Sequence, residues 1–402
     1  MEKFKARPSD IAGLSRLVGE IGTQTSFAPK YFDEEALPRA DFAIGTLSII
    51  RDPFRLLEGT WRDRHGDLSS KCTSLGEELN RAAWLYDDQE RKTYDAINAV
   101  IELRYEGILT AGDPTRQAIG KVPEYDVTVD FGAPDGIEYS PPATIADDFA
   151  DVIREAGGWV ADIDHFIEVH TGRSPIRDLL NPIGGNWNEV KRLGSAFRIA
   201  GEAMENAGLS LEGGAKRVGE TWDGAAASAF DAFAHDQVEA MKWEGPCGRV
   251  IEAASNRIAD EMKKSVISVV AKLKELLDKE VDVTDGKNLV NIALKKVPFL
   301  GPTYQIGTVI LIIKDTIELV EQMVTRIQEV TDAFAKFISL VTSPSGYLNE
   351  QFDRALEPLT DAVEKTKLGI DIKNTADSGP MMRAPKNPFD AGDGADPWAD
   401  AV

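Results

Sequence analysis

The chain has 402 residues, enough for two or three folding units, and 43% of them are apolar, so a large core can be buried. It carries 67 Asp and Glu against 45 Lys and Arg, a net charge of −22. Such a surface repels phosphate backbones, so we expect no nucleic-acid partner. Two Cys and four His exclude a disulfide scaffold and leave little for metal binding, and we expect no metal and no cofactor.

The first 110 residues are patterned as helices. Residues 1–45 predict a short helix, marked by Ile11 and Leu14, followed by a Pro-containing loop. Over residues 46–110, apolar side chains recur at helical spacing on both sides of His65-Gly66-Asp67. Because Gly interrupts helices and Asp caps them, this tripeptide predicts a turn, and the region is expected to form a helical hairpin.

The hydrophobic period changes in residues 111–143. Residues 125–131 alternate apolar and polar side chains, which is typical of a strand. Pro134-Asp135-Gly136 is turn chemistry, and Ile137 and Tyr139 are candidates for a returning strand. We therefore expect a small β-hairpin insert that links two helical regions.

Residues 144–282 return to a helical pattern and contain the most informative motif. Trp222-Asp223-Gly224 separates two long helical stretches and is followed by an Ala-rich run that ends in Phe230. Gly allows a tight turn, and small residues allow two helices to approach closely. An ordinary helix–turn–helix corner with a packed Trp is the alternative explanation. Gly245-Pro246 is a candidate kink in the second helix.

The C-terminal part divides into long helices, residues 283–373, and a tail, residues 374–402. From Ile306 to Val341, apolar residues alternate spacings of four and three, which predicts one long helix with a buried seam. The tail is rich in Gly, Pro, Ala and Asp and is expected to be disordered and acidic. Its Phe389 and Trp398 each follow Pro, so they are candidate partner-binding anchors; a solubilising terminus is the alternative.

Trp222-x-Gly224 with its small-residue sequel resembles the WxG family of type VII (ESX) secretion substrates. Substrates of that system also use a Tyr-x-x-x-Asp/Glu signal that lies close in space to a Trp-x-Gly turn. Tyr86 and Glu90 fit this second motif and would share one helix face. The order of the two motifs is similar to fused PE/PPE-like substrates, in which one chain supplies both halves of the export signal.

The resemblance implies a mainly α protein, with elongated helical hairpins and a core like a four-helix bundle. It implies a secreted actinobacterial substrate, structural, assembling or effector-carrying, that leaves the cytoplasm without a Sec signal peptide. A secretion ATPase or chaperone and a companion secreted substrate are the implied partners, and a homo-oligomer is a further alternative.

The sequence carries weaker signals for two other functions. Residues 297–313 form an apolar segment around Pro298 and Pro302, which leaves a membrane-active, pore-forming or lipid-binding protein as the alternative function. Enzyme signals are poor: His165 and His170 flank Glu168 at the wrong spacing for a zinc protease, and no phosphate-binding loop is present. We expect no catalytic residue. Cys72 and Cys247 lie in different segments, and whether they pair is open.

Overall fold

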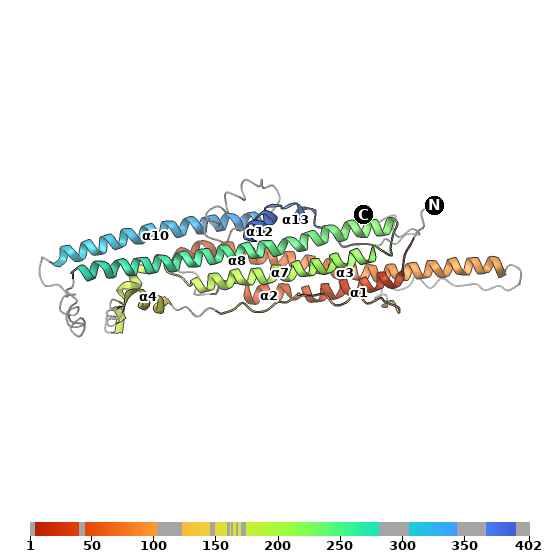
Figure 1. The fold of residues 1–402 in the computed structure, drawn as a ribbon, viewed down its shortest axis with the longest axis horizontal. Coiled ribbons are helices and arrows are strands. Elements are labelled where there is room, and N and C mark those ends of the chain that lie inside the picture. Colours follow the sequence, from red (N-terminus) through yellow and green to blue (C-terminus); the bar gives the residue numbers. More distant parts are fainter. Residues whose placement is uncertain are drawn as a thin grey trace.

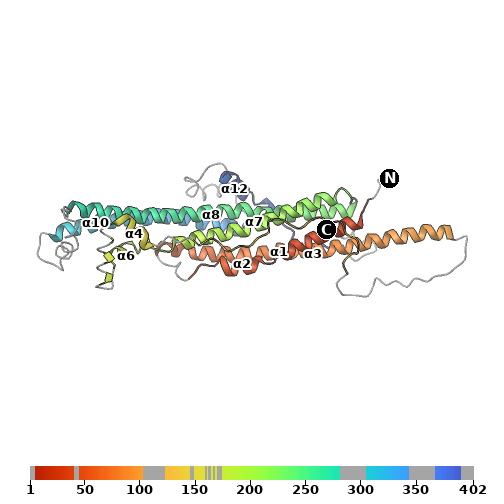
Figure 2. The same cartoon turned by 60° about the horizontal axis from the view of Figure 1, so that its bottom comes forward.

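The protein is an elongated bundle of helices that run along one long axis (Figures 1 and 2). The computed structural model describes residues 5–39, 45–102, 123–144, 149–158, 161, 164–165, 168–169, 174–280, 305–343 and 367–390. The long helices are α1 Pro8–Thr25, α3 Ser48–Glu102, α7 Trp187–Val218, α8 Ala225–Glu280 and α10 Gln305–Thr342. The shorter ones are α2 Ala28–Glu35, η2 Gly45–Leu47, α4 Phe149–Gly157, α6 Pro175–Leu180, α12 Lys367–Ala376 and α13 Gly379–Arg383. The expectation of a mainly α protein is confirmed.

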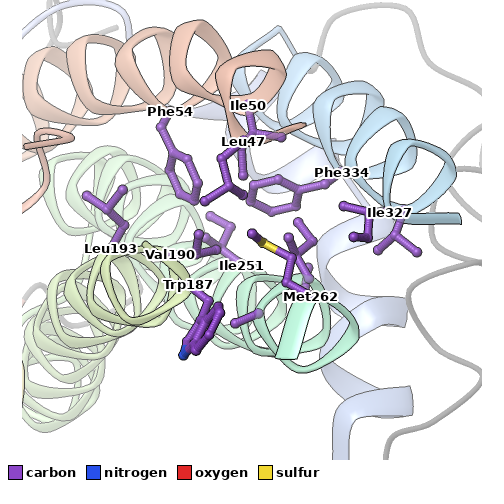
Figure 3. Close-up of a cluster of buried hydrophobic side chains, with 14 of the residues drawn as sticks. Leu47, Ile50, Phe54, Trp187, Val190, Leu193, Ile251, Met262, Ile327 and Phe334 are labelled. Carbon is purple, nitrogen blue, oxygen red and sulfur yellow. The ribbon is translucent and has the colours of Figure 1, made fainter. Parts of the chain in front are cut away.

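Two hydrophobic cores follow one another along the axis. The first, which we call the Trp222 core, is enclosed by α1, the second half of α3, the second half of α7 and the first half of α8. The other, the Phe334 core, lies between the first parts of α3 and α7, the second half of α8 and α10. Figure 3 shows the Phe334 core, in which Phe54 of α3 and Phe334 of α10 lie with ring centroids 5.2 Å apart.

α7 and α8 form the hairpin that joins the two cores, and their backbones approach closely. Gly194, Gly201 and Gly208 recur every seven residues on α7 and face α8. A Cβ atom at Gly201 would lie 2.5 Å from the Glu244 carbonyl oxygen, so only Gly fits there. α8 continues through Pro246, the candidate kink, to Glu280.

The hairpin predicted over residues 46–110 is wrong, because α3 is one helix of 55 residues. Its buried positions continue in one register through the expected break: Trp61, His65, Leu68, Cys72, Leu75, Leu79, Ala82 and Tyr86. His65 is itself part of this seam, and Asp67 pairs with Lys71 on the same helix instead of capping a new one. The antiparallel neighbour of the second half of α3 is α1.

The predicted β-hairpin is also wrong: residues 123–144 are described and contain no strand. The segment instead runs in one direction along α7. The Asp130 carbonyl accepts a hydrogen bond from Arg217 at 2.8 Å, and the Gly136 carbonyl accepts one from Asn206 at 2.9 Å. Because α7 supplies both partners, the chain does not fold back at residues 134–136 to pair with itself.

The seam expected from Ile306 to Val341 lies on one helix, as predicted, and Val320, Ile327, Phe334 and Val341 are buried. Ile317 is an exception, with 42% of its surface exposed. The tail also differs from the prediction, because residues 367–390 are described and contain α12 and α13. Their reason for ordering is contact with α8, which composition does not reveal.

Candidate functional site

The Trp222-Asp223-Gly224 motif forms the turn between α7 and α8, as expected. Gly224 has a φ of +101°, a conformation that side chains with a Cβ rarely adopt, so Gly is required there. The Gly224 carbonyl accepts the Ser228 N–H at 3.0 Å and so begins α8. The turn is fastened to the N-terminal segment, since Asp223 N–H donates to the Lys5 carbonyl at 2.8 Å and Lys5 N–H donates to Asp223 Oδ1 at 2.5 Å.

Trp222 points inward from this turn and meets Tyr86 of α3. The Trp222 Nε1–H donates a hydrogen bond to the Tyr86 hydroxyl oxygen at 3.1 Å. The two rings lie edge to face with centroids 6.2 Å apart, and only 2% of Trp222 and 7% of Tyr86 is exposed. Two motifs that are 136 residues apart in the sequence are therefore in direct contact.

The surroundings of this pair are apolar. Phe230, from the first turns of α8, packs against Trp222 with ring centroids 5.3 Å apart. Burial raises the pKa of the Tyr86 hydroxyl above its ordinary value, and the hydrogen bond from Trp222 opposes that shift. The hydroxyl is therefore neutral at physiological pH, and the contact is a neutral hydrogen bond inside a hydrophobic core.

Glu90 lies one helical turn beyond Tyr86 on α3, so the two residues share a helix face. The Glu90 side chain lies outside the described part of the structure. In Figure 1, α3 continues past the α7–α8 turn and projects beyond the other helices. The Trp222-x-Gly224 turn and the Tyr86-x-x-x-Glu90 stretch therefore lie where α3 leaves the bundle.

The extended segment reaches α3 just before this point. Trp84 Nε1–H donates to the Pro123 carbonyl at 2.8 Å, and Tyr125 N–H donates to the Asn80 Oδ1 at 3.0 Å. The sequence did not predict the parts that Lys5 and Phe230 play at this site, nor the contacts of Trp84 and Asn80 with the extended segment. The signal for Phe230 was present, as the aromatic residue that ends the Ala-rich run, but nothing in the sequence marks Lys5.

Of the two tail aromatics, Phe389 is described and 7% exposed, and it packs inside this chain against Phe230 and Phe233. The sequence predicts that Phe389 binds another protein, whereas in the structure its side chain packs against its own chain. Trp398 lies outside the described residues, as do residues 297–304 of the apolar segment.

The remaining candidates from the sequence are the two cysteines and the histidines near Glu168. Cys72 and Cys247 are free and buried in different cores, so they do not pair. The side chain of His165 is 76% exposed, and Glu168 pairs with Arg177 at 2.8 Å. Within the described segments, no three His, Cys, Asp or Glu side chains gather to hold a metal ion. Nor does any helix of those segments have a stretch apolar enough to cross a bilayer.

Comparison with known proteins adds no relative to this picture: no family model, no curated protein and no solved structure matches the chain.

Proposed function

We propose that this protein is a substrate of a type VII (ESX) secretion system and that it carries both halves of its export signal in one chain. The observation that supports the proposal is the hydrogen bond between Trp222 and Tyr86. A Trp-x-Gly turn and a Tyr-x-x-x-Glu helix are expected to lie together if they form one recognition unit. Here the fold brings them together without a partner subunit.

The Tyr-x-x-x-Glu half of the signal ends at Glu90, which continues the Tyr86 face along the projecting end of α3. In this proposal the buried pair of rings holds the turn against α3, and Glu90 with the exposed Gly224 is what a secretion ATPase or chaperone reads. The role after export is structural, assembling or effector-carrying, and a companion substrate is the proposed partner. The proposed location is outside the cell, without a Sec signal.

Export from a host with a functional type VII system tests the proposal. The chain offers a matched control, because Trp243-Glu244-Gly245 is a second Trp-x-Gly sequence inside α8, and Trp243 is 3% exposed. Trp222→Ala and Trp243→Ala each remove a buried indole, so both should lower the melting temperature. Only Trp222→Ala should abolish export.

Glu90→Gln removes the charge without changing the shape of the side chain. We expect this variant to melt like the wild type and to stay in the cytoplasm. If Trp222→Ala and Glu90→Gln were both exported as efficiently as the wild type, the proposed signal would be wrong, and the motif would be an ordinary helical corner.

A further inference from the structure

Lys5 directs its N–H, its carbonyl and its ammonium group to the turn between α7 and α8. The Lys5 N–H donates a hydrogen bond to Asp223 Oδ1 at 2.5 Å, and the Lys5 carbonyl accepts one from the Asp223 N–H at 2.8 Å. The Lys5 ammonium donates a third, to the carbonyl of Glu220 just after the end of α7. Two residues 218 positions apart are therefore joined by a closed pair of hydrogen bonds, which we call the Lys5–Asp223 clamp.

Lys5 is itself held in place by the helix that follows it. It stands just before α1, whose Ile11 and Leu14 are fully buried in the Trp222 core. The intervening Ala6 also packs against that core. Because α1 lies against both α3 and α7, Lys5 is a fixed point of the bundle, and the turn is the part that the clamp positions.

The three residues of the turn are held in different ways. Trp222 is buried and its indole is bonded to Tyr86, so it fixes the inner side of the turn. Gly224 is exposed, and a Gly backbone can adopt many conformations, so Gly224 does not fix the turn by itself. Asp223 is also exposed, so water competes with its hydrogen bonds and the clamp adds little to the stability of the bundle. What the clamp determines is the orientation of the outer side of the turn.

We propose that Asp223 and Lys5 are positioning residues of the export signal and that their clamp presents Gly224 in one orientation to the component that reads it. This inference rests on the proposed function. The signal then has a third part, the N-terminal segment, beside the Tyr-x-x-x-Glu helix and the Trp-x-Gly turn. The middle residue of Trp222-x-Gly224 is accordingly not interchangeable: it must carry an acceptor oxygen at the distance that Asp, or Asn, provides.

Hydrogen exchange on the full-length chain tests the clamp. Asp223→Ala removes the acceptor of the Lys5 N–H, so the amides of residues 5 and 223 should exchange at least about fivefold faster, the equilibrium factor for one lost hydrogen bond. The rates are compared after correction for the intrinsic rate of each side chain. Asp223→Asn is the matched control, because it loses the charge but keeps the acceptor oxygen, and it should exchange like the wild type. Neither variant should change the melting temperature.

Export from the same host tests the positioning role. Asp223→Ala should be exported at least about fivefold less efficiently than the wild type, and Asp223→Asn should restore export. Lys5→Pro removes the N–H donor from the other side of the clamp and should lower export by a similar factor. Because the two substitutions break the same hydrogen bond, the double variant should be no worse than either single one. Losses that multiply in the double variant would overturn the clamp.

The same measurements separate this inference from the proposed function. If Trp222→Ala stays in the cell while Asp223→Ala is exported like the wild type, the export signal stands and the clamp is not part of it. If Asp223→Asn is exported as poorly as Asp223→Ala, the charge is read directly and the positioning role is wrong. Normal export of Trp222→Ala would contradict the proposed function and the role of the clamp in export, while the exchange rates would still decide whether the clamp holds the turn.

Discussion

The close approach of α7 and α8 at Gly201 makes a sharp test of the fold. In Gly201→Ala, the new Cβ atom would lie 2.5 Å from the Glu244 carbonyl oxygen, nearly 1 Å inside the usual carbon–oxygen contact of about 3.3 Å. The contacted atom belongs to a helix backbone and cannot rotate away. The two helices must therefore separate, and Gly194 and Gly208 on the same face lose their contacts with α8.

Overpacking of this kind costs about 1–3 kcal/mol, while replacing Gly by Ala in a helix recovers up to about 1 kcal/mol. We expect Gly201→Ala to lower the free energy of unfolding by about 1–2 kcal/mol. Gly213, also on α7, is the control, because a Cβ there meets nothing within 4 Å. Gly213→Ala should raise the free energy of unfolding by about 0.5–1 kcal/mol.

Urea unfolding followed by circular dichroism measures both changes, provided that the slope with denaturant is the same in the three proteins. The opposite signs are the important result, because helix propensity alone predicts stabilisation at both positions. If Gly201→Ala were as stable as Gly213→Ala, the helices would not be in contact at this point, and the packing of α7 on α8 would be wrong.

Three further predictions concern other parts of the bundle. Burial lowers the pKa of His65, so below about pH 6.5 this residue stays neutral in the folded protein but is protonated in the unfolded chain. The free energy of unfolding should therefore fall as the pH drops below about 6.5, by up to about 1.4 kcal/mol per pH unit. His65→Leu should remove this dependence in urea titrations between pH 7 and 5. Ile327→Ala should lower the free energy of unfolding by about 2–4 kcal/mol because Ile327 is fully buried, whereas Ile317→Ala, at a position with 42% exposure, should lower it by less than about 1 kcal/mol; equal losses would contradict the orientation of α10. Gly224→Ala should cost about 1–2 kcal/mol from the strained φ, measured by thermal unfolding, and a stabilised variant would contradict the turn geometry.

The spacing of apolar residues in the sequence was sufficient to locate individual helices. The alternating spacing from Ile306 to Val341 marks α10 almost to its ends, because a helix buries every third or fourth residue whatever its neighbour is. Trp222-Asp223-Gly224 marked the α7–α8 turn for an equally local reason, the positive φ that Gly224 adopts. Tyr86 could be singled out by its spacing from Glu90, but its contact with Trp222 could not.

The predicted break in α3 was wrong because a polar residue of the helix is stabilised in the core by contacts with another helix. The tripeptide around His65 predicts a break, yet His65 is stacked on Trp61 in the core, with its Nε2 3.5 Å from a Glu244 oxygen. Glu244 is in turn neutralised by Arg64, so a charged group is tolerated in the seam of a continuous helix. No pattern within α3 contains that information, because the compensating carboxylate lies on α8.

The same distinction applies to the extended segment and the tail. Alternation in residues 125–131 describes a chain with one apolar side, and the sequence alone determined that property. Whether this stretch pairs in a sheet or lies along helices was decided by α1 and α7, since the Ser9 carbonyl of α1 accepts the Val129 N–H and Arg217 of α7 donates to the Asp130 carbonyl. Composition likewise placed few apolar groups after residue 374, but Phe389 packs against Phe230 and Phe233 on α8, and Met381 and Ala384 also pack against the core, so the segment is ordered by tertiary contacts.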